Sequence, residues 1–143
     1  MPNRNGAEPK ATHTRILVVD DQRDMREFLA DVLCAAGYDA LVVPDGLEAM
    51  RVIGADPEDP DEPPFLTVDV VVTDLRMPVA DGMDVLEAVR RSCPWVRTIL
   101  LTAFATPEVR LEAERLGADA VLSKPFSLAE LLGTLEEVLS RAR

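Results

Sequence analysis

The chain has 143 residues, 48% of them hydrophobic, which is enough for one domain with a buried core. Its net charge of −11 argues against nucleic-acid binding, which needs a basic face, and against attraction to anionic membranes. No apolar run is long enough to span a membrane, and the first residues contain no apolar signal core.

Histidine and cysteine are too rare for several common kinds of site. His13 is the only histidine, so neither a histidine metal cluster nor a Ser-His-Asp triad is expected. Cys34 and Cys93 lie far apart, with no Cys-x-x-Cys pairing. We expect both to be reduced thiols, with no disulfide between them, in a cytoplasmic protein.

Five apolar, often β-branched runs alternate with five segments in which apolar residues recur every three or four positions. Residues 1–13 are polar and are predicted to be a disordered tail, followed by one domain over residues 14–143. The predicted buried strands are residues 16–19, 39–43, 68–74, 96–101 and 120–122.

The helices between these strands have recognisable ends. Gly37 and Gly117 close the first and fourth helices, Asp81 caps the third, and Thr106 followed by Pro107 opens the fourth. Capping boxes are predicted at Asp45-x-x-Glu48 for the second helix and at Ser127-x-x-Glu130 for the fifth.

Residues 56–64 form an acidic, proline-rich stretch that interrupts the alternation. Proline blocks both helix and ladder, and the like charges repel, so an exposed, mobile loop is expected. The loop joins the second helix to the third strand and therefore lies at the amino ends of the strands. We expect a passive insertion, with partner contact as the less favoured alternative.

Strict alternation of strands and helices predicts an α/β fold with a doubly wound, five-stranded parallel sheet. Right-handed crossovers favour the flavodoxin-like strand order 2-1-3-4-5. Helices 1 and 5 are then expected on one face of the sheet, and helices 2, 3 and 4 on the other.

Polar residues stand where four of these strands end, and parallel strands bring those ends to one edge. Asp20 and Asp21 follow the first strand, Asp74 ends the third, Thr102 follows the fourth and Lys124 follows the fifth. Taken singly, each residue has an ordinary structural explanation as a cap, a strand residue or a solvated charge. Their common position favours a shared site.

Three carboxylates without histidine or cysteine suit Mg²⁺, with Mn²⁺ as a possible substitute. The arrangement fits phosphoryl transfer, which needs a nucleophile, a metal and fixed donors. Asp74 is the expected nucleophile, and Asp20, Asp21 and Asp74 are expected to hold the metal with the main-chain carbonyl of Arg76. Lys124 and Thr102 are expected to hold the phosphoryl oxygens.

The segments around these residues resemble the receiver domain of bacterial two-component response regulators. The matching segments are residues 16–21, 73–78, 81–82, 101–103 and 124–126. The resemblance implies phosphorylation of Asp74 by a sensor histidine kinase, Mg²⁺ dependence, self-catalysed hydrolysis and a cis peptide between Lys124 and Pro125. It implies a regulatory phosphoacceptor rather than an enzyme with a separate substrate.

The family also implies a switch at Thr102. Charge at Asp74 is expected to draw Thr102 inward and to change the surface of helix 4, strand 5 and helix 5. A downstream effector domain or protein would read that surface, and a homodimer through it is possible. No direct contact with nucleic acid or membrane is expected.

One switch position departs from the family pattern. Receivers often carry Tyr or Phe three residues before the lysine, whereas this chain has Val121, so that aromatic relay should be muted. Phe104, two residues after Thr102, is a candidate substitute that would shift on activation. Packing over the site or on helix 4 is an equally open interpretation of Phe104.

Two other classes remain open on the residues alone. An aspartyl-phosphate phosphotransferase or phosphatase of haloacid-dehalogenase type would need an acid two residues after the nucleophile, where this chain has Arg76. A flavodoxin-like cofactor binder would need a hydroxyl- or glycine-rich loop after the first strand, where this chain has Asp20 and Asp21.

Overall fold

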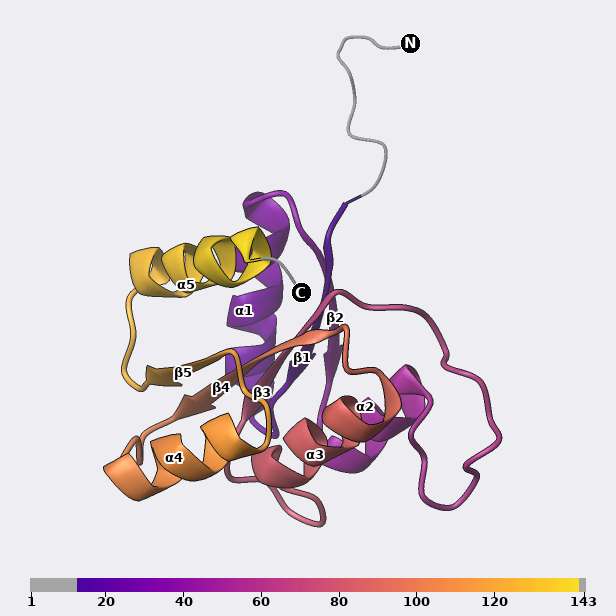
Figure 1. Cartoon of the computed structure of the whole chain (residues 1–143). Helices are drawn as coiled ribbons and strands as arrows, with labels where there is room; N and C mark the ends of the chain where they lie inside the picture. Colours follow the sequence, from indigo (N-terminus) through magenta and orange to yellow (C-terminus); the bar gives the residue numbers. More distant parts are fainter. Residues whose placement is uncertain (1–12, 142–143) are drawn as a thin grey trace, which may run out of the picture.

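The structure is a computed structural model that describes residues 13–141, in which five strands alternate with five helices (Figure 1). The strands are β1 (Arg15–Val19), β2 (Asp39–Val43), β3 (Val70–Asp74), β4 (Arg97–Thr102) and β5 (Ala120–Ser123). The helices are α1 (Arg23–Ala35), α2 (Gly46–Ile53), α3 (Gly82–Ser92), α4 (Pro107–Arg115) and α5 (Leu128–Ser140). The predicted tail of residues 1–13 lies outside the described residues except for His13.

All four strand pairings are parallel, and the strand order β2-β1-β3-β4-β5 confirms the predicted topology. Four of the five predicted strands were wrong by one or two residues at an end. The first begins at Arg15 and not at Ile16, and the fifth ends at Ser123 and not at Leu122. The third strand begins at Val70, where pairing with Ile16 starts, and not at Val68. The fourth includes Thr102, which pairs in register with Ser123, and begins at Arg97 and not at Val96.

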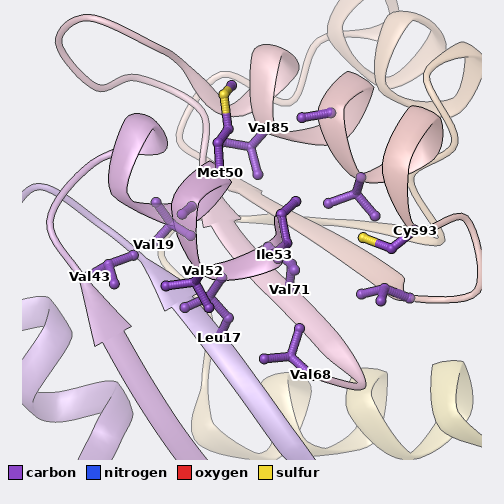
Figure 2. Packing of buried hydrophobic residues seen from close by; sticks show 14 of the residues in the cluster. Leu17, Val19, Val43, Met50, Val52, Ile53, Val68, Val71, Val85 and Cys93 are labelled. Atoms are coloured by element: carbon purple, nitrogen blue, oxygen red, sulfur yellow. The ribbon is translucent and has the colours of Figure 1, made fainter. Parts of the chain in front are cut away.

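The two faces of the sheet are covered as predicted, with α1 and α5 on one side and α2, α3 and α4 on the other (Figure 1). Successive strand residues point to opposite faces, so neighbours in β1 enter different clusters. Ile16 and Val18 pack with Leu29 of α1 and Leu131 of α5. The opposite cluster joins β1, β2 and β3 to α2 and α3 (Figure 2), and its labelled members are Leu17, Val19, Val43, Met50, Val52, Ile53, Val68, Val71, Val85 and Cys93.

Helix starts follow the predicted caps, with one correction. Ser127 and Glu130 form the full capping box of α5. Asp45 accepts a hydrogen bond from the Glu48 backbone at 2.9 Å, but the predicted box at α2 is only half formed. The Glu48 side chain instead accepts from Arg51 at 2.6 Å, because this cation one turn further along competes for it.

A tight turn lies between β3 and α3. The backbone amide of Ala80 donates to the carbonyl of Pro78 at 2.8 Å, and Val79 between them has a positive φ of 71°. This geometry is that of a γ-turn, and a β-branched side chain is strained in it. The turn returns the chain so that the Gly82 amide donates to the Leu75 carbonyl at 2.8 Å.

The acidic loop between α2 and β3 extends away from the sheet on the right of Figure 1, and residues 57–65 are exposed as predicted. Its two ends are fastened together. The Phe65 amide at the far end donates to the Val52 carbonyl of α2 at 3.0 Å. At the near end, the Ala55 amide closes the last turn of α2 by donating to the Met50 carbonyl at 2.7 Å. Gly54 has a φ of +81°, and a Cβ there would lie 3.0 Å from Pro64.

Both cysteines are free thiols, Cys34 exposed on α1 and Cys93 buried at the end of α3. Each helix within residues 13–141 is too short or too polar to span a lipid bilayer.

Candidate functional site

Asp20 and Asp21 follow β1 at the carboxyl edge of the sheet, but their environments differ. Asp20 is completely buried, whereas Asp21 is exposed. The Asp20 Oδ1 atom accepts a hydrogen bond from the Gln22 amide at 2.8 Å. Its Oδ2 atom is buried and lacks a hydrogen-bond partner in the described part of the chain. A buried carboxylate oxygen without a hydrogen-bond partner is costly, and a bound cation would offset that cost.

Asp74 is the last residue of β3 and faces the same edge. Its Oδ1 atom accepts from the Leu75 amide at 2.9 Å and from the Lys124 ammonium at 3.1 Å. Gly82 allows the start of α3 to come this close, because a Cβ there would lie only 2.5 Å from the Asp74 carbonyl oxygen. The side chain is therefore fixed by backbone on one side and by a cation on the other.

Lys124 reaches the site from the end of β5. Its Nζ atom also lies 3.8 Å from Asp20 Oδ2, too far for a hydrogen bond but close enough for attraction. The peptide bond from Lys124 to Pro125 is cis, as the family resemblance implied. The Lys124 amide donates to the Thr102 carbonyl at 2.8 Å, which ties the end of β5 to the end of β4.

The charges of the site do not balance within the protein. Carboxylate oxygens of Asp20, Asp21 and Asp74 lie within 4.8 Å of one another, with the Lys124 ammonium as the cation next to them. Burial raises the pKa of Asp20, and repulsion from Asp74 and Asp21 adds to that rise, while the Gln22 amide and Lys124 lower it. An all-oxygen donor set with excess negative charge fits a hard divalent cation such as Mg²⁺.

Thr102 ends β4 on the same edge and is almost fully buried, with 1% of its surface exposed. Its hydroxyl oxygen accepts a hydrogen bond from the Phe104 amide at 2.9 Å. Val121, which pairs in register with Leu100, is partly buried against the cluster of α3 and α4. The predicted relay residues therefore lie along the β4–β5 side of the site.

Sequence reasoning missed one contact over the site. The Arg76 guanidinium lies 4.2 Å from the centre of the Phe104 ring, a cation–π geometry. Each residue stands two positions after a site residue, Asp74 or Thr102, on neighbouring strands. This equal spacing could have predicted the contact, because the parallel pairing of β3 and β4 places the loops that follow these two strands side by side. The contact bears on the open interpretation of Phe104, because it packs the ring against the loop after β3.

Residues 16–136 match the family described as response regulator receiver domain, and the chain belongs to that family. Among curated relatives, the response regulator MprA of Mycobacterium ulcerans is 36% identical over 129 residues, which is 90% of this chain and 51% of the relative. MprA of Mycobacterium avium is 36% identical over the same length, 52% of that protein. The chain thus spans about half the length of the curated relatives it matches.

Solved structures agree with this assignment. The chemotaxis protein CheY4 of Vibrio cholerae superposes with a TM-score of 0.78 at 30% identity, covering 89% of this chain and 99% of that one. The response regulator TrrA of Thermotoga maritima, solved in complex with Mg(2+)-BeF, gives a TM-score of 0.74 at 29% identity, covering 87% and 98%.

As a receiver domain, the chain is a regulatory phosphoacceptor and not a metabolic enzyme. Membership in this family decides against the two alternative classes, the haloacid-dehalogenase-like enzyme and the flavodoxin-like cofactor binder. The acidic triad fits a magnesium site.

Proposed function

We propose that Asp74 is the phosphoacceptor of this receiver. The observation that carries the proposal is the placement of its carboxylate, held by the Leu75 amide and the Lys124 ammonium and flanked by two further carboxylates. Both hydrogen bonds go to Oδ1, which leaves Oδ2 as the oxygen that attacks. A nucleophile fixed in this way loses little orientational freedom before reaction.

The donor in this proposal is a phosphohistidine of a sensor histidine kinase. The Asp74 Oδ2–phosphorus bond forms while the phosphorus–nitrogen bond breaks, and the bonding pair returns to the imidazole nitrogen, which takes up a proton. Lys124 and Thr102 hold the phosphoryl oxygens. Lys124 is already within reach of Asp74. The Thr102 hydroxyl accepts from the Phe104 amide and so keeps its own O–H to donate to a phosphoryl oxygen.

Asp20, Asp21, Asp74 and the main-chain carbonyl of Arg76 would hold Mg²⁺, or Mn²⁺ in its place. The metal would neutralise the carboxylates and the equatorial oxygens of the transferred group. The unpartnered Oδ2 atom of Asp20 and the excess of acids around it support this ligand set.

We further propose that the β4–β5 side carries the signal. Movement of Thr102 toward a phosphorylated Asp74 would disturb Phe104 and the packing of α4, β5 and α5, a bistable element of the kind that switches use. Leu111 on α4 and Leu128 on α5 are exposed apolar residues, which supports contact with an effector or a second copy there. A shift of Phe104 on activation stays a prediction.

The same proposal places the protein in the cytoplasm, where a histidine kinase would present its phosphoryl group. It also includes no direct binding of nucleic acid by this domain.

The test is intact mass after incubation with acetyl phosphate and Mg²⁺. We expect wild type to gain one phosphoryl group, Asp74→Asn to gain none, and chelation by EDTA to prevent the gain. Asp69→Asn is the matched control, because it changes an aspartate at the opposite end of the same strand region. Equal phosphorylation of the Asp74→Asn variant would refute the assignment. Structures with and without beryllofluoride test the shift of Phe104.

A further inference from the structure

A groove that the proposed chemistry does not use lies between β2, α2 and the acidic loop. Its volume is about 720 Å³. Leu41 and Val43 of β2 and Val52 of α2 form an apolar floor, and Pro64 and Phe65 form the wall on the loop side. Phe65 is 74% exposed although it is aromatic, so an apolar surface stands open beside the groove.

The rim of this groove is strongly acidic. Residues 45–65 contain seven carboxylates and one guanidinium, so this segment alone carries a net charge of −6 out of −11 for the chain. Its arginine, Arg51, is already engaged by Glu48 at 2.6 Å and by Asp56 at 3.2 Å. Glu62 is exposed on the groove wall, so the rim presents uncompensated negative charge.

The strand that forms the floor has a free edge. Within residues 13–141, β1 is the sheet neighbour of β2, and no strand pairs on its other side. The Asp39 amide donates to Thr14, and the Val43 carbonyl accepts from Asp20, so the odd-numbered residues pair with β1. By alternation, the peptide groups of Ala40 and Val42 point toward the free edge, where an added strand would bond.

The loop that walls the groove is held in place rather than loosely attached. Its ends are joined by the bond from Phe65 to Val52 and by the close approach of Pro64 to Gly54. Inside the loop, Asp56 accepts from the Glu58 amide at 2.9 Å while its other oxygen meets Arg51. A wall fixed in advance lowers the ordering cost of binding.

We propose that this groove binds an extended, Lys/Arg-bearing segment of a partner protein. Its main chain pairs with the edge of β2, an apolar side chain enters the groove between Val52 and Phe65, and its cations meet the acidic rim. Edge pairing supplies affinity, and the pocket and the charges supply selectivity. A second copy of this chain is a poorer occupant, because each copy carries −11.

The probe is a phage-displayed library of random dodecapeptides, selected against the full chain in EDTA so that the metal site plays no part. We expect enriched peptides to alternate Lys or Arg with apolar residues and to bind more weakly as salt rises. Peptide-induced NMR shifts should map to Leu41, Val43 and Val52. No enrichment, or enrichment of peptides without basic residues, would overturn the proposal.

Two matched pairs of variants test the same surface with the best selected peptide. Phe65→Ala and Glu62→Lys should each weaken binding about tenfold or more, as central interface contacts do. Trp95→Ala removes another exposed aromatic, 63% exposed, and Asp31→Lys reverses an acid on α1; both should bind like wild type. Equal losses in the control variants would contradict a role for this groove.

Two other occupants give opposite results. If residues 1–12, which carry Arg4 and Lys10, fill the groove themselves, a chain without them will bind the basic peptide more tightly than the full chain. If a second copy fills it, sedimentation will show a dimer that Phe65→Ala dissociates. Either outcome overturns the proposal, and neither affects phosphorylation of Asp74, so its failure and that of the proposed function are distinguishable.

Discussion

Asp20 is a fully buried carboxylate at the proposed metal site. Its carboxylate is fully buried, one oxygen lacks a partner among the described residues, and its pKa is raised by that burial. Removing the negative charge should therefore help folding while harming metal binding.

We expect Asp20→Asn to raise the free energy of unfolding of the metal-free protein by about 1–2 kcal/mol, because a neutral amide is less costly to bury beside two carboxylates than a third carboxylate is. Urea denaturation at pH 7.5 in EDTA measures it. With excess Mg²⁺ the order should reverse, because a ligand that binds the folded state stabilises wild type more than the variant.

Asp21→Asn is the matched control, because Asp21 is exposed and its desolvation is small. It should leave metal-free stability nearly unchanged. A metal-free Asp20→Asn variant less stable than wild type would show that the carboxylate is satisfied in some other way.

The two cysteines differ in accessibility and should differ in reactivity. Cys34 is exposed, whereas burial raises the pKa of the Cys93 thiol and so lowers its thiolate fraction. At pH 8, a chromogenic disulfide should react with one thiol rapidly and with the second only in denaturant. Cys34→Ser should abolish the fast phase; two equally fast thiols in the native protein would refute this assignment.

At the scale of elements, the close approach of α3 to β3 positions Asp74, the proposed phosphoacceptor. Gly82 lies where a Cβ would meet the Asp74 carbonyl at 2.5 Å and Leu100 at 2.8 Å. We expect Gly82→Ala to destabilise the protein by about 1–3 kcal/mol, the common cost of overpacking, and to slow phosphorylation of Asp74. Urea unfolding and mass spectrometry measure the two effects.

Gly133 provides the matched control for this substitution. It lies within α5, is exposed, and has nothing within 4 Å of an added Cβ. Gly133→Ala should stabilise the protein by roughly 0.5–1 kcal/mol through helix propensity. If both substitutions acted alike, the contact with Asp74 would not be the cause.

The order of strands and helices could be predicted from the sequence. The β-branched runs of the strands differ clearly from the helical segments, in which apolar residues recur every three or four positions. The sequence was also sufficient to gather Asp20, Asp21, Asp74 and Lys124 at one edge, because parallel strands place their carboxyl ends together. These predictions depend on topology, which hydrophobic pattern and crossover handedness largely determine.

The features that could not be predicted from the sequence depend on the conformations of individual side chains. Glu48 could pair with the backbone of Asp45 or with Arg51, and only the folded geometry decides between them. The stacking of Arg76 on Phe104 likewise needs the paths of two loops. The groove beside β2 could not be predicted, because the composition of the acidic loop is typical of an unstructured segment. In the structure, hydrogen bonds at the base of the loop hold it against α2.

For the molecule as a whole, the acidic loop and the acceptor site belong to different regions. The loop enters β3 at its amino end, and Asp74 closes the same strand at its carboxyl end. Deleting residues 57–62 should therefore leave the rate of phosphorylation by acetyl phosphate within about twofold of wild type, because the loop and the acids lie at opposite ends of β3. A change of several-fold would mean that the loop communicates with Asp74.

The γ-turn at Val79 has a practical consequence. Its side chain is 88% exposed, so its strained backbone is not compensated by burial. Val79→Gly should relieve roughly 1–3 kcal/mol of backbone strain in the folded state. Part of that gain in stability is offset, because glycine gives the unfolded chain more conformational freedom. A higher melting temperature with unaltered acetyl phosphate kinetics would make this position the natural first choice for engineering a more heat-resistant form, and an unchanged or lower melting temperature would show that the turn accommodates valine without cost.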